Sequence, residues 1–273
     1  MRRGYPACMP ARTPEPYRAR GSGAAHDGGG SSRQGRSGPA RRIDLPPDSR
    51  FRSRGERNFE LPKVVADELG RKAAVISTRA RRSPVTLERR MASAAMAYER
   101  DRYHDALSAL KPVLEAAPQS GSVRELHGLV LYRLGRWRAA AKELRVFYSL
   151  SGSYDQHPVI ADCERALGHP DKVRSIWDEI RRAGVDREVL VEGRLVMAGT
   201  LADAGCFAEA IELLRPEARL RRNPDISHLR QWYALADLYE RTGDLSRARE
   251  LFARVAEVAP DLLDAPQRLA ALS

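Results

Sequence analysis

One short run of the chain brings together side chains that could do nucleophilic chemistry: His157, Asp162 and Cys163. A cysteine beside a histidine base is the arrangement that generates a reactive thiolate. Asp162 and Cys163 are neighbours in a stretch with helical spacing, however, so their side chains point in different directions. We therefore predict that Cys163 packs as a small apolar residue and that this run is not catalytic.

Metal binding is not predicted either. Three further histidines are scattered, at expected helix starts or turns: His104, His127 and His169. The cysteines are Cys8, Cys163 and Cys206. Their number is odd, they are far apart and no CxxC occurs, so neither a zinc knuckle nor a disulfide framework is expected. This cysteine usage is typical of a reducing cytoplasm.

The common catalytic and nucleotide-binding motifs do not occur in the sequence. It has no HExxH, no P-loop lysine motif, no GxSxG and no dinucleotide glycine fingerprint. The three glycines at 28–30 follow no expected strand, so they do not form a phosphate cradle. We predict that the protein is not an enzyme and that it needs no cofactor.

Charge divides the chain into two parts. The formal net charge is +11, and the first 90 residues contain 21 Lys and Arg against 9 Asp and Glu. The rest of the chain is close to neutral. A basic segment favours nucleic acid or another polyanion as a contact, and here only the N-terminal part provides one. No apolar run is long enough for a membrane helix, and no secretory signal is expected.

Composition predicts three regions. Residues 1–57 are rich in Gly, Pro, Ser and Arg, so we expect a disordered basic arm. This arm is either a solvated tail or the result of a start codon assigned too early. Residues 58–82 combine apolar residues at helical spacing with a cluster of arginines, which predicts a short amphipathic helix and a basic hinge. Residues 83–273 form the third region.

The third region repeats with a period of about 34 residues. Its last unit carries an almost complete pattern of large, small and turn residues: Trp232, Leu235, Ala236, Tyr239, Gly243, Ala248, Phe252 and Pro260. Earlier units keep the small and turn positions, as in Gly128, Gly135 and Ala140, and begin near Leu87, Gly121, Tyr154 and Val191. About five units result, followed by a short capping helix that Pro266 is expected to interrupt.

On these motifs the chain resembles tetratricopeptide-repeat proteins. The segments at 123–128, 132–137, 161–168 and 191–195, with Leu61, Pro62 and Lys63, are also similar to a group of actinobacterial cytoplasmic members of that family. The resemblance implies an all-α, right-handed superhelical solenoid of about five helical hairpins. Small residues such as Gly128 and Ala248 are expected where two helices cross. The three tryptophans, Trp137, Trp177 and Trp232, are expected to fill the core.

In this family the first helix of each hairpin lines a concave groove. The residues that this assigns to a partner-binding surface are Tyr98, Tyr132, Arg133, Arg165, Tyr233 and Arg241. Tyr and Arg are frequent anchors of protein interfaces. The alternative is a solvated face held by its own salt bridges. The positions that clamp a chaperone carboxylate in some family members are occupied here by Glu125, Leu129 and Asp162, so that activity is not expected. The arginines favour an acidic or amphipathic ligand.

The sequence therefore predicts a cytoplasmic, non-catalytic scaffold that binds a peptide or helix of a protein partner in the groove. The alternative is a nucleic-acid- or ribosome-associated accessory protein that binds through the Arg-rich arm. Arginines bind phosphate by releasing counterions, so such binding would weaken with salt. Few aromatic residues interleave with these arginines, so stacking on bases would be poor.

Overall fold

The computed structural model describes residues 84–215 and 223–272. Within these ranges it contains eleven helices and no strand. The arm expected at 1–57 and the helix and hinge expected at 58–82 lie outside the described residues. None of the described helices is both long enough and apolar enough to cross a membrane.

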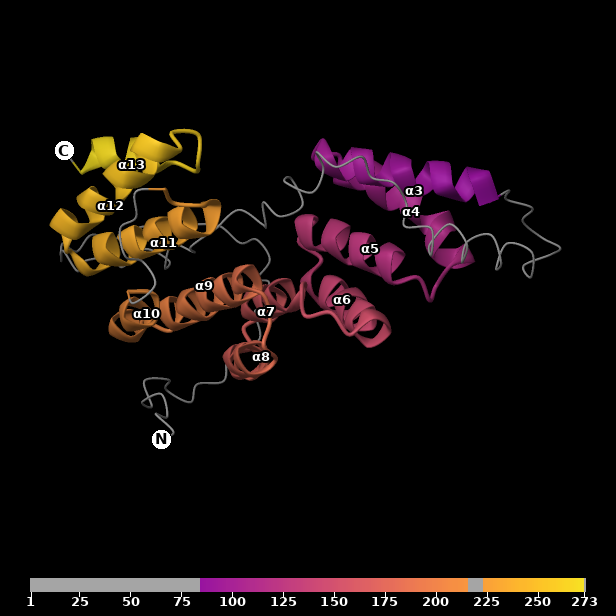
Figure 1. Cartoon of the computed structure of the whole chain (residues 1–273), viewed down its shortest axis with the longest axis horizontal. Coiled ribbons are helices and arrows are strands. Elements are labelled where there is room, and N and C mark those ends of the chain that lie inside the picture. The colour runs from indigo at the N-terminus through magenta and orange to yellow at the C-terminus, as the bar shows by residue number, and fades with distance from the viewer. Residues whose placement is uncertain (1–83, 216–222, 273) are drawn as a thin grey trace, which may run out of the picture.

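Ten helices form five consecutive hairpins, and an eleventh follows them. The pairs are α3 (Pro84–Glu99) with α4 (Tyr103–Ala116), α5 (Gly121–Arg133) with α6 (Trp137–Ser151), α7 (His157–Ala166) with α8 (Pro170–Arg182), α9 (Arg187–Asp203) with α10 (Phe207–Leu214), and α11 (Ile226–Thr242) with α12 (Leu245–Val258). The last helix is α13 (Ala265–Ala271). The hairpins follow an arc, with α5, α7, α9 and α11 toward its inner side and α6, α8, α10 and α12 toward its outer side (Figure 1).

Small apolar residues recur at corresponding positions on both helices of every hairpin. On the first helices they are Ala94, Gly128, Ala161, Ala198 and Ala236, and on the second helices they are Ala106, Ala140, Val173, Ala210 and Ala248. All of them are buried. The two helices approach closely at Gly128, where an added Cβ atom would lie 2.6 Å from Cδ2 of Leu144. The repeat frame derived from the sequence is therefore confirmed.

Each hairpin turns through one residue with positive φ. In four hairpins this residue is a glycine: Gly135, Gly168, Gly205 and Gly243. In the first hairpin it is Asp101, with φ of 58°. The amide of the following residue then donates to a carbonyl five residues earlier, as from Arg102 to Ala97 and from Asp244 to Tyr239. This is the hydrogen bond of a Schellman helix end, which needs a left-handed residue and so favours glycine.

Large side chains fill the space between hairpins. Trp177, Trp232 and Phe252 are buried, as expected. Trp137 is only partly buried and meets Tyr132 edge to face, with the ring centroids 5.3 Å apart. The three tryptophans therefore pack in or against the core, and none is fully exposed.

The last helix departs from the sequence prediction at its start. Pro266 was expected to interrupt a capping helix, but it lies at the beginning of α13 instead. This is the position where proline is favoured, because its missing amide hydrogen has no helical partner there and its φ suits the helix. Arg249 of α12 donates to the carbonyl oxygen of Leu272, so α13 is held against the last hairpin.

Candidate partner-binding face

The candidate site is the surface formed by the first helices of the hairpins, which we call the inner face because these helices lie toward the inner side of the arc (Figure 1). The residues assigned to binding lie in or near the last turn of their helices, with the exception of Tyr233 in the middle of α11: Tyr98, Tyr132, Arg133, Arg165, Tyr233 and Arg241. Except for Tyr233, the structure therefore places them at the C-terminal ends of their helices.

The three tyrosines are more buried than the sequence suggested. Tyr98, Tyr132 and Tyr233 are only 7–8% exposed and belong to the core. Each ring is therefore part of the core as well as of this face. Tyr98 meets Tyr103 edge to face, and Tyr233 meets Phe252 in the same way. Whether any of them also contacts a partner stays a prediction.

Arg133 joins the first two hairpins. Its guanidinium lies 3.0 Å from a carboxylate oxygen of Asp101, in the turn after α3. It also stacks over the ring of Tyr103, 4.7 Å from the ring centroid. The hydroxyl of Tyr103 donates to the same carboxylate. Arg133 therefore mainly joins two repeats, and its positive charge is only partly available to a ligand.

Arg165 joins the third and fourth hairpins and is almost fully buried. It lies 2.8 Å from Asp162 on its own helix and 3.0 Å from Asp203 at the end of α9. Burial by itself lowers the pKa of Arg165, but the two carboxylates outweigh burial and raise it. Asp162 also accepts a hydrogen bond of 2.5 Å from the Tyr132 hydroxyl, which ties the second hairpin to the third.

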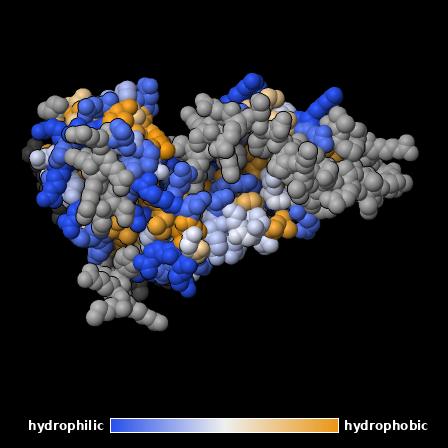
Figure 2. All heavy atoms as spheres, viewed as in Figure 1, coloured by the Kyte–Doolittle hydropathy of each residue, from blue (hydrophilic) through white to orange (hydrophobic). Residues whose placement is uncertain are grey.

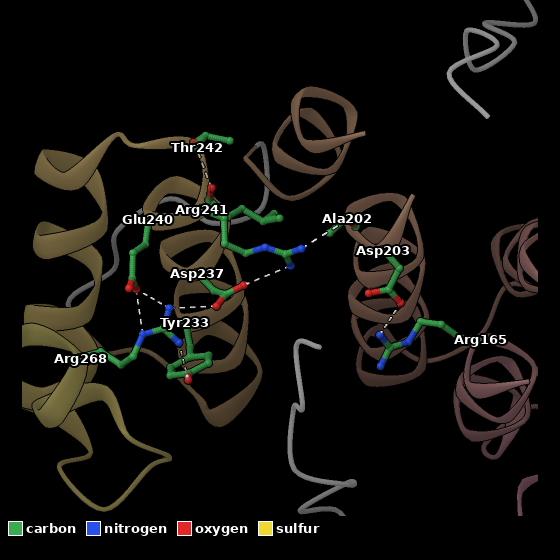
Figure 3. A network of polar contacts seen from close by, with 10 residues as sticks. Arg165, Ala202, Asp203, Tyr233, Asp237, Glu240, Arg241, Thr242 and Arg268 are labelled. Atoms are coloured by element: carbon green, nitrogen blue, oxygen red, sulfur yellow. Dashed lines mark hydrogen bonds and ion pairs between the residues drawn. The ribbon is translucent and has the colours of Figure 1, made fainter. Parts of the chain in front are cut away.

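The last hairpin and α13 meet in a denser polar cluster (Figure 3). Arg268 of α13 donates to Asp237 at 2.9 Å and to Glu240 at 2.8 Å, and its Nη1 lies 3.3 Å from the Tyr233 hydroxyl. That hydroxyl donates to Asp264. Burial lowers the pKa of Arg268, but the bound carboxylates more than reverse this. The side chain is therefore fixed as a cation.

Arg241 contacts both this cluster and the preceding hairpin. Its Nη2 lies 3.5 Å from the carbonyl oxygen of Ala202 in α9, and its Nη1 lies 3.7 Å from Oδ2 of Asp237 (Figure 3). Its guanidinium also lies over the ring of Phe207, 4.8 Å from the centroid. Like Arg133 and Arg165, Arg241 therefore bridges two repeats.

Together these contacts form a series that we call the polar ladder, with one step at each junction between repeats. Its steps are Asp101 to Arg133, Tyr132 to Asp162, Arg165 to Asp203, Ala202 to Arg241, and Asp237 with Glu240 to Arg268. The sequence predicts one of the two contacting residues in most steps, because Tyr and Arg are frequent anchors of protein interfaces. It does not predict that each of these residues already contacts an oxygen atom of the adjacent repeat, which in most steps belongs to a carboxylate.

The run considered for nucleophilic chemistry is structural, as expected. Cys163 is fully buried, and burial raises the pKa of its thiol, so the thiolate is disfavoured. Asp162 faces Tyr132 and Arg165 instead. His157 packs against Tyr148 and Tyr154, and burial lowers the pKa of its imidazole. Among the described residues of this run, neither Asp162 nor His157 acts as a base toward the thiol, since both contact other partners.

The other histidines do not come together in a metal site. No group of three potential ligands is found among the residues that the structure describes. His104 and His169 lie at helix starts, as expected. The sequence prediction for His127 was wrong, because this residue lies inside α5, where its imidazole is 3.4 Å from Glu143.

One buried carboxylate was not singled out from the sequence. Glu164 is 3% exposed and contacts Arg145 of α6 at 2.5 Å, His169 at 2.7 Å and Lys172 at 3.3 Å. Burial by itself raises the pKa of Glu164, but these three partners lower it to about 2. Glu164 thus anchors α6 and the start of α8 to α7, away from the polar ladder. The tetratricopeptide pattern has no acidic residue at this position, so the sequence did not indicate a role for Glu164.

The visible surface is mixed in character. Blue hydrophilic residues predominate on the face in Figure 2, and orange residues gather only in small patches between them. The exposed large apolar side chains of the described residues are scattered over different helices: Met96, Leu150, Ile226, Leu245 and Val258. The described part of this face is therefore largely polar.

Comparison with known proteins agrees with this geometry. Residues 232–261 match the sequence model of the tetratricopeptide repeat family. The fold is that of a tetratricopeptide-repeat solenoid. The match covers most of the last hairpin, which is also the unit whose sequence pattern is most complete. No curated protein shows a significant match to the chain.

Two solved structures share the fold. TTC0263, a thermophilic tetratricopeptide-repeat protein from Thermus thermophilus, has a TM-score of 0.56 and 20% identity over 68% of this chain and 98% of its own. NprR, solved in complex with its cognate peptide NprX, has a TM-score of 0.52 and 15% identity over 82% of this chain and 75% of its own. Identities this low support the fold alone.

Proposed function

We propose that this protein is a non-catalytic scaffold whose inner face binds a segment of a protein partner. The observation that carries the proposal is the stack itself: the hairpins follow an arc, and the first helices α5, α7, α9 and α11 lie toward its inner side (Figure 1). Such a surface offers many parallel side chains to an extended or helical ligand. NprR, which shares the fold, was solved with its cognate peptide, so a solenoid of this kind can accommodate a peptide.

The chemistry of the described residues supports a binding role over catalysis. The candidate nucleophile is buried, and every arginine of the polar ladder is held by a carboxylate or a carbonyl oxygen. The resemblance to cytoplasmic family members supports the cytoplasm as the working compartment. The alternative of binding nucleic acid through the basic arm concerns residues outside the described ranges.

Because most residues of the polar ladder hold the repeats together, they are poor positions for testing the inner face by substitution. Substituting Tyr132 or Arg165 would remove core packing or leave two carboxylates facing each other, and the stack would then be damaged with the surface. Asp203 is the better probe. It is the most exposed acidic residue of the ladder after Asp101, with 36% of its side chain exposed, and it lies at the end of α9.

The experiment places a photo-crosslinking amino acid at position 203 and, as a matched control, at Glu250, an exposed residue of α12 on the outer side. Both full-length variants are irradiated in a lysate of the source organism. We expect discrete crosslinked proteins from position 203 that are not obtained from position 250. Equal crosslinking from both positions would place the working surface elsewhere.

A further inference from the structure

The first helices of the later hairpins are enclosed far more completely than the second helices. In α11 every residue from Ser227 to Tyr239 is buried, whereas α12 buries four residues. In α9 every residue from Met197 to Ala202 is buried, whereas α10 buries two. An α-helix turns once in 3.6 residues, so consecutive residues over such a length point to all sides of it. Neither α9 nor α11 therefore exposes a side to solvent over these residues.

Part of this enclosure lies on the inner face. The helices that pack against α9 are α7, α8, α10 and α11, which lie beside it or toward the outer side of the arc (Figure 1). Leu195, Gly199 and Asp203 are spaced four residues apart, so they share the side of α9 that carries the ladder. Asp203 is 36% exposed, but Gly199 is buried against the Arg165 guanidinium and Leu195 is 2% exposed. The inner face of α9 is therefore open at its C-terminal end and enclosed toward its middle.

Neighbouring first helices show the same enclosure. Leu129, four residues before Arg133 in α5, is 3% exposed, and Ala234, three residues before Asp237 in α11, is 2% exposed. With Leu195 they form a row of apolar side chains on the inner face that solvent does not reach. Helices that are buried all round are typical of a layer that is covered on both faces.

The sequence supplies an element that suits this place, in the amphipathic helix expected within residues 58–82. Its apolar residues Leu61, Val64, Val65 and Leu69 lie on one side of such a helix. As a helix, residues 61–76 would be about 24 Å long, which spans about three helices packed about 8–10 Å apart. The residues 77–83 that connect it to α3 reach about 25 Å when extended, so the segment can lie over the middle of the arc.

The other place for this segment is the free edge of the first hairpin, where a preceding repeat would pack. In α9 this edge includes Gly193, where an added Cβ atom would lie 2.8 Å from Ile180 of the preceding hairpin. The equivalent edge of α3 carries Arg89, Ser93 and Met96, and all three are exposed, Met96 by 49%. The free edge is therefore uncovered, and the inner face is the enclosed surface.

We propose that residues 58–82 pack on the inner face of the same chain and that a partner binds there by displacing them. The displacement rests on the proposed function, whereas the packing of the segment does not. The apolar stripe of the segment covers Leu129, Leu195 and Ala234. The C-terminal ends of the first helices, where Asp203 is exposed, stay open for the first contact of a partner. Because the segment is tethered beside the face, it competes at a high effective concentration.

The first test asks where the segment lies in the full-length chain. A photo-crosslinking amino acid is placed at Val65, on the apolar stripe, and as a matched control at Asp67, on the opposite side of the expected helix. The purified proteins are irradiated at low concentration, and the crosslinked peptides are identified by mass spectrometry. We expect position 65 to crosslink within one chain to α5, α7, α9 or α11, and position 67 to give little product.

The second test releases the segment. Leu61→Glu with Val65→Glu places two charges on the apolar stripe, and Lys63→Gln with Arg71→Gln makes the same change in net charge away from it. Circular dichroism verifies that the repeats stay folded in both variants. With the crosslinker at position 203, the first variant should capture about tenfold more partner from a lysate, because two apolar side chains no longer hold the segment in place. The second variant should capture as much as wild type.

Several results would overturn the inference. One is a probe at position 65 that crosslinks to the free edge of α3, to the outer helices or to a second chain, or that gives no more product than position 67. Another is equal capture by the two double variants, which would contradict displacement. None of these results touches the proposed scaffold function, because capture from position 203 but not from position 250 tests it separately. If that capture failed, the intrachain crosslink from position 65 would still be expected.

Discussion

Replacing Gly128 with alanine tests the close packing of α5 against α6. The added Cβ atom would lie 2.6 Å from Cδ2 and 2.7 Å from Cγ of Leu144, and 3.3 Å from its backbone nitrogen. Leu144 is fully buried, so its side chain has little room to retreat, and the nitrogen belongs to the α6 backbone. The two helices must therefore move apart.

The size of the effect follows from two opposing contributions. Overpacking of a close-packed core costs about 1–3 kcal/mol. Alanine is favoured over glycine inside a helix by about 1 kcal/mol, which offsets part of that cost. We expect Gly128→Ala to lower the free energy of unfolding by about 1 kcal/mol, measured by denaturant titration followed by circular dichroism.

The control lies in the same helix. At Gly121 an added Cβ atom would lie 3.8 Å from Phe147, which is ordinary contact, so Gly121→Ala should change stability by less than about 0.5 kcal/mol. The partner is tested with Leu144→Ala, which alone should cost about 2–5 kcal/mol. In the double variant the clash is gone, so the two costs should not add. A Gly128→Ala protein as stable as wild type, or strict additivity with Leu144→Ala, would refute this account of the crossing.

Three further predictions concern other positions. Ala248→Leu should cost about 1–3 kcal/mol because Ala248 is fully buried at a crossing, whereas Ala253→Leu on the same helix should have little effect in thermal melts; equal effects would mean that the repeat frame is shifted. Asp101→Ala should be less stable than Asp101→Gly by about 1 kcal/mol, because both lose the carboxylate but only alanine strains the positive φ; identical stabilities would contradict this. Glu164 has a lowered pKa of about 2, so its contribution is complete above the ordinary pKa of 4.5 and is lost as pH falls from there toward 2. Denaturant titrations of Glu164→Gln should therefore show a lower free energy of unfolding than wild type at neutral pH and a shallower decline of that free energy over the acid range. If wild type and Glu164→Gln depend on pH in the same way, Glu164 does not stabilise the fold through its charge.

The repeat architecture was predictable because the constraints on it are local and periodic. A residue at a helix crossing must be small, and a residue at a hairpin turn must accept positive φ, so Gly128, Ala248 and Gly243 mark the fold directly in the sequence. The start of α13 was misjudged because Pro266 can either break a helix or begin one, and the choice depends on the packing of α13 against α12.

The candidate site was predictable only in part, because its partners are far apart in sequence. The family pattern gave the helix face on which Arg165 and Tyr132 lie. It did not show that Asp203, on another helix, pairs with Arg165, or that Tyr132 is buried while donating to Asp162. Whether a polar residue on this face is available to a ligand depends on side-chain contacts between repeats, and these follow from the curvature of the stack.

The turn at Asp101 has a consequence for how freely the repeats can be exchanged. In four hairpins the left-handed position is a glycine, whose backbone accepts positive φ whatever lies beside it. In the first hairpin the turn residue also carries the carboxylate that Arg133 of the second hairpin contacts. The first hairpin is therefore not a modular unit. If it were moved to another place in the stack, or separated from α5, it would keep its strained backbone angle and lose the contact that accompanies it.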